Sequence, residues 1–121
     1  MIIGTGMDIT EVKRIRQAVE KWGDDFLRRV FTESELKNAK TRVSFYKHLA
    51  GRFAAKEAIF KAVGDNKLSW QDIQIHNNQA GKPICQFLNG KYKDINVYIS
   101  ISHVKTYAVA NAVITKKAKF S

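Results

Sequence analysis

One helix dominates what this chain can fold into. Residues 44–63 have the pattern of a single long helix, and a glycine follows them, as at many helix ends. Because a helix turns about 100° per residue, Leu49, Phe53 and Phe60 fall within one narrow arc that faces a core. Glu57 lies inside this arc. A carboxylate among core-facing residues is costly unless it is paired or binds a metal ion, so Glu57 is the first candidate functional residue.

Two interpretations of Glu57 are open from this helix alone. Lys61 lies one turn later at the edge of the arc, where the two side chains could form an ordinary i,i+4 ion pair. The other interpretation is a metal ligand, and Asp8 favours it. Asp8 ends an expected strand at 2–8, and two glycines on its strand face leave space over the backbone. Two carboxylates, with phosphate oxygens and waters, are the usual way to hold Mg²⁺. Arg52, Lys56 and Lys61 on the same helix add cations that suit phosphates.

The rest of the chain alternates short strands with helices, which predicts one α+β domain over residues 1–121. Thr10 is expected to cap a helix that runs to about Trp22, and residues 32–35 match a capping box at the start of another helix. The later strands are expected at 73–75, 84–88, 97–102 and 107–114. The last two form a hairpin and are apolar at nearly every position, as in strands buried on both faces.

Composition narrows the class of function. The chain has 21 Lys and Arg against 11 Asp and Glu, a formal charge of +10, which favours polyanionic partners. A basic nucleic-acid-binding domain is therefore the main alternative to an enzyme, although the cations do not interleave with aromatic residues as in RNA-recognition patterns. Cys85 is the only cysteine, and the sequence starts without a signal-peptide pattern. No stretch approaches the ~20 apolar residues of a membrane span, so we expect a cytoplasmic protein.

Six blocks of the sequence, taken together and in order, resemble the holo-[acyl-carrier-protein] synthases, the small trimeric type of phosphopantetheinyl transferase. The blocks lie at 6–15, 29–36, 49–62, 70–73, 81–83 and 100–103. The block within the long helix is specific, whereas each of the others alone would be weak. The resemblance implies a fold in which a small antiparallel sheet packs against a long helix and shorter helices.

The resemblance also implies the chemistry. In that family two acidic ligands of Mg²⁺ correspond to Asp8 and Glu57, and Lys61 matches a lysine that contacts phosphate. A serine of apo acyl carrier protein attacks the β-phosphorus of coenzyme A and receives phosphopantetheine, a step of fatty acid biosynthesis, and adenosine 3′,5′-bisphosphate leaves. Glu57, directly or through a metal-bound water, is the candidate for taking the serine proton, and Asp8 is then mainly a ligand.

Further residues match family positions that bind substrates. Arg52 and His103 match positions near bound coenzyme A, and Pro83 falls in a turn near its adenine end. Arg14 matches a basic residue that meets the acidic recognition helix of the carrier protein. The family is typically a homotrimer with coenzyme A in clefts between subunits, so the same assembly is expected here.

Two segments depart from the family pattern. Residues 63–69 form a shorter loop with a single glycine, and Val104 stands where the family often has a small polar residue. We expect some contacts to coenzyme A to be missing or supplied by other residues. The motifs also leave open a related transferase that acts on a carrier domain of a larger synthase.

Overall fold

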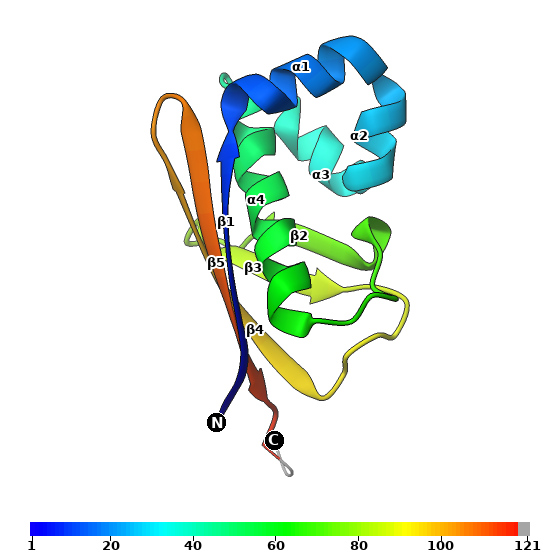
Figure 1. Ribbon diagram of the computed structural model, residues 1–121, viewed down its shortest axis with the longest axis vertical. Coiled ribbons are helices and arrows are strands. Elements are labelled where there is room, and N and C mark those ends of the chain that lie inside the picture. The colour runs from blue at the N-terminus through cyan, green and yellow to red at the C-terminus, as the bar shows by residue number, and fades with distance from the viewer. Residues whose placement is uncertain (119–121) are drawn as a thin grey trace.

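The computed structural model describes residues 1–118. A long helix, α4 (Phe45–Val63), runs through the middle with a three-stranded sheet along one side, and a short hairpin crosses behind the helix in this view (Figure 1). The remaining elements are β1 (Ile2–Glu11), α1 (Val12–Trp22), α2 (Asp24–Val30), α3 (Glu33–Ala39), the 3-10 helix η1 (Trp70–Asp72), β2 (Ile73–Asn77), β3 (Pro83–Phe87), β4 (Ile95–His103) and β5 (Tyr107–Lys116). The expected α+β architecture is confirmed.

The larger sheet is antiparallel with the strand order β1-β5-β4, and α4 contacts all three strands. The residues that β5 turns toward α4 are mostly alanines: Ala108, Ala110 and Ala112 are at most 1% exposed. Such small side chains let the helix lie close to the sheet. Asp8 on β1 pairs with Ala110 in this sheet, so it is held at the edge of the helix–sheet contact.

Gly4 and Gly6 hold β1 directly against α4. A Cβ atom on Gly6 would overlap the carbonyl oxygen of Ala58, and one on Gly4 would overlap that of Ala62. The expectation that these glycines clear space for a ligand is therefore wrong, because the helix backbone fills that space. Their effect is to fix the distance between Asp8 and the side chains of α4.

The outer face of the sheet is exposed in the single chain. Ile3, Met7 and Ile9 on β1 are 53%, 61% and 62% exposed, and Tyr98 on β4 is 52% exposed. The expected burial of β4 and β5 on both faces is thus not found: β5 is buried on one face only, and β4 lies at an edge. Contiguous exposed apolar surface of this kind usually marks an interaction site.

Two predicted helix ends are confirmed. The Thr32 side chain accepts a hydrogen bond from the Glu35 backbone, and the Glu35 carboxylate accepts one from the Thr32 backbone, which completes the capping box of α3. Gly64 ends α4 in the left-handed conformation with φ 72°, and its N–H donates to Phe60 O. No helix among residues 1–118 is both long and apolar enough to cross a membrane.

The start of α1 differs from the prediction. β1 continues beyond Thr10, and the helix begins only at Val12, whose N–H donates to Thr106 O at 2.9 Å. Thr10 does not cap the helix: it still belongs to β1, the N-cap position is Glu11, and the Thr10 hydroxyl donates to Asp8. The seven-residue helix α2 was not expected, since it is too short to show a clear apolar period.

Candidate active site

Asp8 and Lys61 meet where β1 crosses the C-terminal half of α4. Lys61 Nζ lies 3.4 Å from Asp8 Oδ1 and donates to Met7 O at 2.9 Å. The hydroxyl of Thr10, two residues further on the same strand face, donates to Asp8 Oδ2 at 2.6 Å. Both oxygens of Asp8 therefore have a donor nearby. The Lys61 side chain is 55% exposed, so its ammonium remains accessible to a second anion.

Glu57 reaches the same place from α4. It lines one hollow of about 390 Å³ together with Asp8. Burial raises the pKa of the Glu57 carboxyl, the charge of Asp8 adds to the rise, and Lys61 opposes it. Lys61 forms its ion pair with Asp8, and none between Lys61 and Glu57 occurs among residues 1–118. The interpretation of Glu57 as one half of a simple i,i+4 pair is not supported.

The donor set at this place fits Mg²⁺. Residues 1–118 contain no group of three or more His, Cys, Asp and Glu side chains that could hold a metal ion by themselves. The chain thus offers two carboxylates, from Asp8 and Glu57, that share one hollow. Mg²⁺ is commonly bound by one or two carboxylates and completes its shell with waters and substrate phosphates. Structural zinc is instead held by four protein ligands, which are mostly Cys sulfur and His nitrogen atoms.

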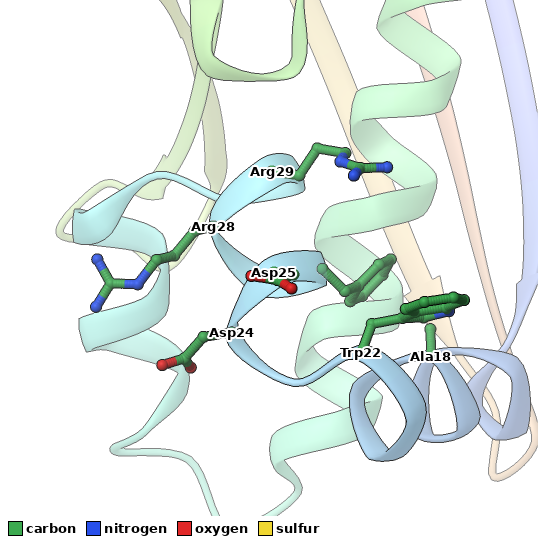
Figure 2. A pocket seen from close by; sticks show the side chains of 7 residues that line it. Ala18, Trp22, Asp24, Asp25, Arg28 and Arg29 are labelled. Carbon is green, nitrogen blue, oxygen red and sulfur yellow. The ribbon is translucent and has the colours of Figure 1, made fainter.

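The hollow beside the two carboxylates continues along α1. Arg14, Ala18 and Phe26 line it, and the last two also line a neighbouring hollow of about 740 Å³. This second hollow lies between α1 and α2, and its other lining residues are Trp22, Asp24, Asp25, Arg28 and Arg29 (Figure 2). A long groove therefore connects the carboxylates with the exposed Trp22 and the basic end of α2.

The other predicted cofactor residues gather toward the N-terminal half of α4. Arg52 is buried, and its guanidinium donates to Asn77 Oδ1 at 2.8 Å; Asn77 pairs with Pro83 across the β2–β3 hairpin. His103, at the end of β4, lies against Gly51, where any side chain would overlap the imidazole. Arg52, Pro83 and His103 thus form a second cluster at this end of α4, and none of the three lines the hollow that contains Asp8 and Glu57.

Two cations and a neutral histidine that the sequence analysis did not single out extend this second cluster. Arg42, Lys47 and His48 line a hollow of about 270 Å³ with His103, and no acidic residue lines it. Burial lowers the pKa of His48 to about 4, and the charges of Arg52 and Arg42 contribute. Burial also lowers the pKa of His103. A hollow lined by cations without acidic partners suits a phosphate group. The sequence offered no clear signal for it, since 42–48 lies at the border of a loop and a helix.

Lys56 is the site residue that sequence reasoning misjudged. Its place on the long helix suggested a cation available to phosphates, but Lys56 is completely buried. Its ammonium lies 2.7 Å from the carboxylate of Glu35 on α3. The capping box identified Glu35 as a helix cap, but nothing in the sequence linked the two residues.

Comparison with known proteins identifies the family. The family model of the 4′-phosphopantetheinyl transferase superfamily matches residues 4–112. The chain belongs to this superfamily. Relatives in the superfamily match along nearly the whole chain. The holo-[acyl-carrier-protein] synthase of Thermodesulfovibrio yellowstonii is 44% identical over 116 residues, which cover 95% of this chain and 100% of the relative. The holo-[acyl-carrier-protein] synthase of Clostridium tetani is 41% identical over 123 residues, which cover 94% of this chain and 96% of the relative.

Solved structures of the superfamily show the same fold. The Bacillus anthracis holo-(acyl-carrier-protein) synthase in complex with CoA (3′,5′-ADP) matches with a TM-score of 0.84 at 39% identity, covering 97% of this chain and 99% of that one. The Helicobacter pylori synthase in complex with coenzyme A matches with a TM-score of 0.82 at 32% identity, covering 92% and 99%. The resemblance stated from the motifs is confirmed.

Proposed function

We propose that this chain transfers phosphopantetheine from coenzyme A to a serine of apo acyl carrier protein, giving holo carrier and adenosine 3′,5′-bisphosphate. Its relatives are named for this product, and two similar structures contain coenzyme A or its adenosine bisphosphate part. The observation that carries the proposal is that Asp8 on β1 meets Glu57 and Lys61 on α4, which are far from it in sequence, at one place. Such a site combines metal-binding carboxylates with a phosphate-binding cation.

Asp8 and Glu57 would hold Mg²⁺. When bound there, the ion would offset negative charge on the pyrophosphate of coenzyme A. Thr10 supports this arrangement because its hydroxyl fixes one oxygen of Asp8. Lys61 is close to Asp8 yet half exposed, so it can contact a phosphate oxygen from the protein side.

At the β-phosphorus, the transfer forms one P–O bond and breaks another. The serine Oγ bonds to the β-phosphorus of coenzyme A, and the bond from this phosphorus to the bridging oxygen breaks, releasing adenosine 3′,5′-bisphosphate. The serine proton needs an acceptor, and Glu57 is the candidate. Glu57 would take the proton directly or through a metal-bound water.

Coenzyme A binding is assigned to Lys61, Arg52, Pro83 and His103. Lys61 would contact the pyrophosphate, while the other three belong to the second cluster near the cationic hollow. This hollow suits the remaining phosphate of coenzyme A. Its cations also offer a replacement for contacts that the short loop at 63–69 does not supply.

The carrier protein is proposed to dock along α1. Arg14 lines the hollow that contains Asp8 and Glu57, so a carrier bound to it would bring its serine to the site. The groove between α1 and α2 continues this surface (Figure 2). Its exposed Trp22 would provide apolar contact area, and Arg28 and Arg29 would attract acidic side chains of the carrier.

We further propose that the chain is a single domain and assembles into a homotrimer. This trimer would act in the cytoplasm, in fatty acid biosynthesis. Two observations support the assembly. The outer face of the β1-β5-β4 sheet exposes large apolar side chains that a second copy would cover. In addition, none of Arg52, Pro83 and His103 lines the hollow of Asp8 and Glu57 within one chain, so a neighbouring copy could bring its cluster to the carboxylates.

The direct experiment is intact-mass spectrometry of apo acyl carrier protein incubated with this protein, coenzyme A and Mg²⁺. The carrier should gain the mass of one phosphopantetheine group, and omission of Mg²⁺ or of coenzyme A should abolish the gain. No gain, while a known synthase works in parallel, would contradict the proposal. Glu57→Gln should lose most turnover at saturating Mg²⁺, with exposed Glu33→Gln as the matched control. Near-normal turnover of Glu57→Gln would exclude Glu57 as the base.

The formal charge of +10 keeps a nucleic-acid-binding domain as the second candidate. The two are separated by retention on heparin and on immobilised acyl carrier protein across a salt series. A nucleic-acid-binding protein should lose heparin affinity steeply with salt, without any need for Mg²⁺. The transferase should modify its carrier only when Mg²⁺ and coenzyme A are present.

A further inference from the structure

Lys56 and Glu35 form a buried ion pair that the transfer reaction described above does not use. The side chains of Lys56 and Glu35 are 0% and 1% exposed, and Lys56 Nζ lies 2.7 Å from Glu35 Oε1. The ammonium also donates to Val30 O at 2.8 Å and to Trp70 O at 3.1 Å. Its three N–H groups therefore all have acceptors. Lys56 ties α4 to the end of α2, to α3 and to η1.

Glu35 completes the connection from the other side. Its Oε1 accepts the Thr32 N–H at 2.8 Å, and its Oε2 accepts the Ile75 N–H of β2 at 2.8 Å. One ion pair thus joins five elements: α2, α3, α4, η1 and β2. No buried side-chain nitrogen or oxygen among residues 1–118 lacks a hydrogen-bond partner, so this network is fully satisfied.

Stability alone does not account for such a pair. Taking two charges out of water is expensive, and well-packed apolar residues in place of a buried ion pair are often as stable or more so. What the pair provides is a fixed geometry, because three acceptors surround the ammonium at set positions. A helix held in this way cannot rotate or slide without breaking several of these bonds.

The geometry fixed by Lys56 concerns the active site directly. Glu57 is the next residue on α4, about 100° around the helix. The opposite side of the helix touches β1, where Gly6 lies against the backbone of Ala58. The helix is therefore held between the ion pair and the strand that carries Asp8.

We propose that Lys56 and Glu35 are positioning residues that set the rotation of α4 and thereby hold Glu57 opposite Asp8. This inference rests on the proposed function. The proposal predicts that loss of the Lys56–Glu35 pair weakens metal binding and lowers turnover. Both effects should be larger than the loss of folding stability explains. Partners that orient a metal ligand commonly contribute about 10- to 100-fold to metal affinity.

The test uses the double variant Lys56→Met/Glu35→Gln, which removes both charges and leaves none unpaired. Mn²⁺ binding is followed by electron paramagnetic resonance, unfolding by urea, and transfer by intact mass at varied coenzyme A. The double variant should bind Mn²⁺ about tenfold more weakly and lose kcat, with little change in KM for coenzyme A. Gln71→Leu is the matched control: Gln71 links η1 to the carbonyls of Arg28 and Phe31, and both of these acceptors lie outside α4. It should lose stability only.

A folded double variant with the Mn²⁺ affinity and kcat of the wild type would overturn the inference, as would an equal loss of affinity in Gln71→Leu. If the double variant does not fold, Glu35→Asp keeps the charge and shortens the side chain by one methylene. Glu35→Asp should weaken Mn²⁺ binding measurably, and an unchanged affinity would overturn the inference. If wild type neither binds Mn²⁺ nor transfers phosphopantetheine, the proposed function fails, and the inference falls with it.

Discussion

At the scale of single residues, Gly6 is what allows the candidate site to form. Gly6→Ala would place a methyl group onto the carbonyl of Ala58, and β1 would have to move away from α4. We expect the free energy of unfolding to fall by about 1–3 kcal/mol, the usual cost of overpacking. Urea unfolding measures this, with Thr5→Ala on the opposite face of the strand as the control. Equal stabilities for Gly6→Ala and wild type would contradict the close strand–helix contact.

His48 gives the molecule a predicted pH dependence. Burial and nearby cations lower its pKa from 6.5 to about 4 in the folded chain. Between these values the unfolded chain binds more protons, so stability is complete above pH 6.5 and is lost as the pH falls toward 4. His48→Gln cannot take up this proton and should lose less stability over that range. The comparison is made by urea unfolding at pH 7.5, 6 and 5 in phosphate-free buffer. Parallel losses in both proteins would contradict the burial of His48 beside cations.

The sequence alone identified Asp8, Glu57 and Lys61 as candidates. Asp8 shares a strand face with two glycines, Glu57 lies on an apolar helix face, and Lys61 belongs to the motif of the long helix. The structure brings the three close together, and their roles in binding Mg²⁺ and phosphate stay a prediction. Lys56 could not be placed in this way, because a lysine that reaches a buried carboxylate has the same sequence pattern as an exposed one. Its partner Glu35 lies 21 positions earlier, and only the packing of α3 on α4 connects them.

At the scale of elements, the capping box of α3 is the local signal with the clearest measurable effect. Thr32→Ala would remove the acceptor for the Glu35 N–H and the hydroxyl donated to Gln74 Oε1 at 2.8 Å. We expect a loss of about 1–2 kcal/mol in the free energy of unfolding. Ser34→Ala, exposed on the same helix, should change it little. A loss below that of Ser34→Ala would show that the cap does not stabilise α3.

Elements with a strong local signal were predicted, and those decided by tertiary contacts were not. The helix α4 and the hairpin of β4 and β5 have long periodic or apolar patterns, and both are present. The boundary between β1 and α1 was misplaced because β1 is extended by pairing with β5, up to Glu11 opposite Tyr107. The preference of threonine for helix caps is a local signal, so it carries no information about the pairing of β1 with β5.

At the scale of the whole molecule, the exposed sheet face predicts the assembly. Val109 lies on this face of β5, where it pairs with Ile9 and Ser102. Val109→Lys would bury a charge without a partner in the proposed trimer. The Val109→Lys substitution should therefore convert the trimer to monomers and reduce phosphopantetheine transfer. Sedimentation velocity measures the assembly state. Val43→Lys, at an exposed loop position, should leave it unchanged. A trimer that persists in Val109→Lys would contradict this use of the face.

The prediction of a single domain over residues 1–121 stays a prediction, as does the cytoplasmic location. The fold and the family are established, since solved synthases superpose along nearly the whole chain. The whole molecule brings Asp8 of β1 and Glu57 of α4 to the same hollow. The proposed transfer depends on these two carboxylates binding a metal ion.

The most direct measurement of that claim is a Mn²⁺ titration followed by electron paramagnetic resonance, with coenzyme A present, on wild type, Asp8→Asn and Glu57→Gln. Wild type should bind one ion per chain, and each variant should bind it at least about tenfold more weakly, because each removes one of two carboxylate ligands. Glu33→Gln, on the exposed face of α3, should match wild type. Unchanged Mn²⁺ affinity in both Asp8→Asn and Glu57→Gln would show that the metal binds elsewhere and would contradict the account.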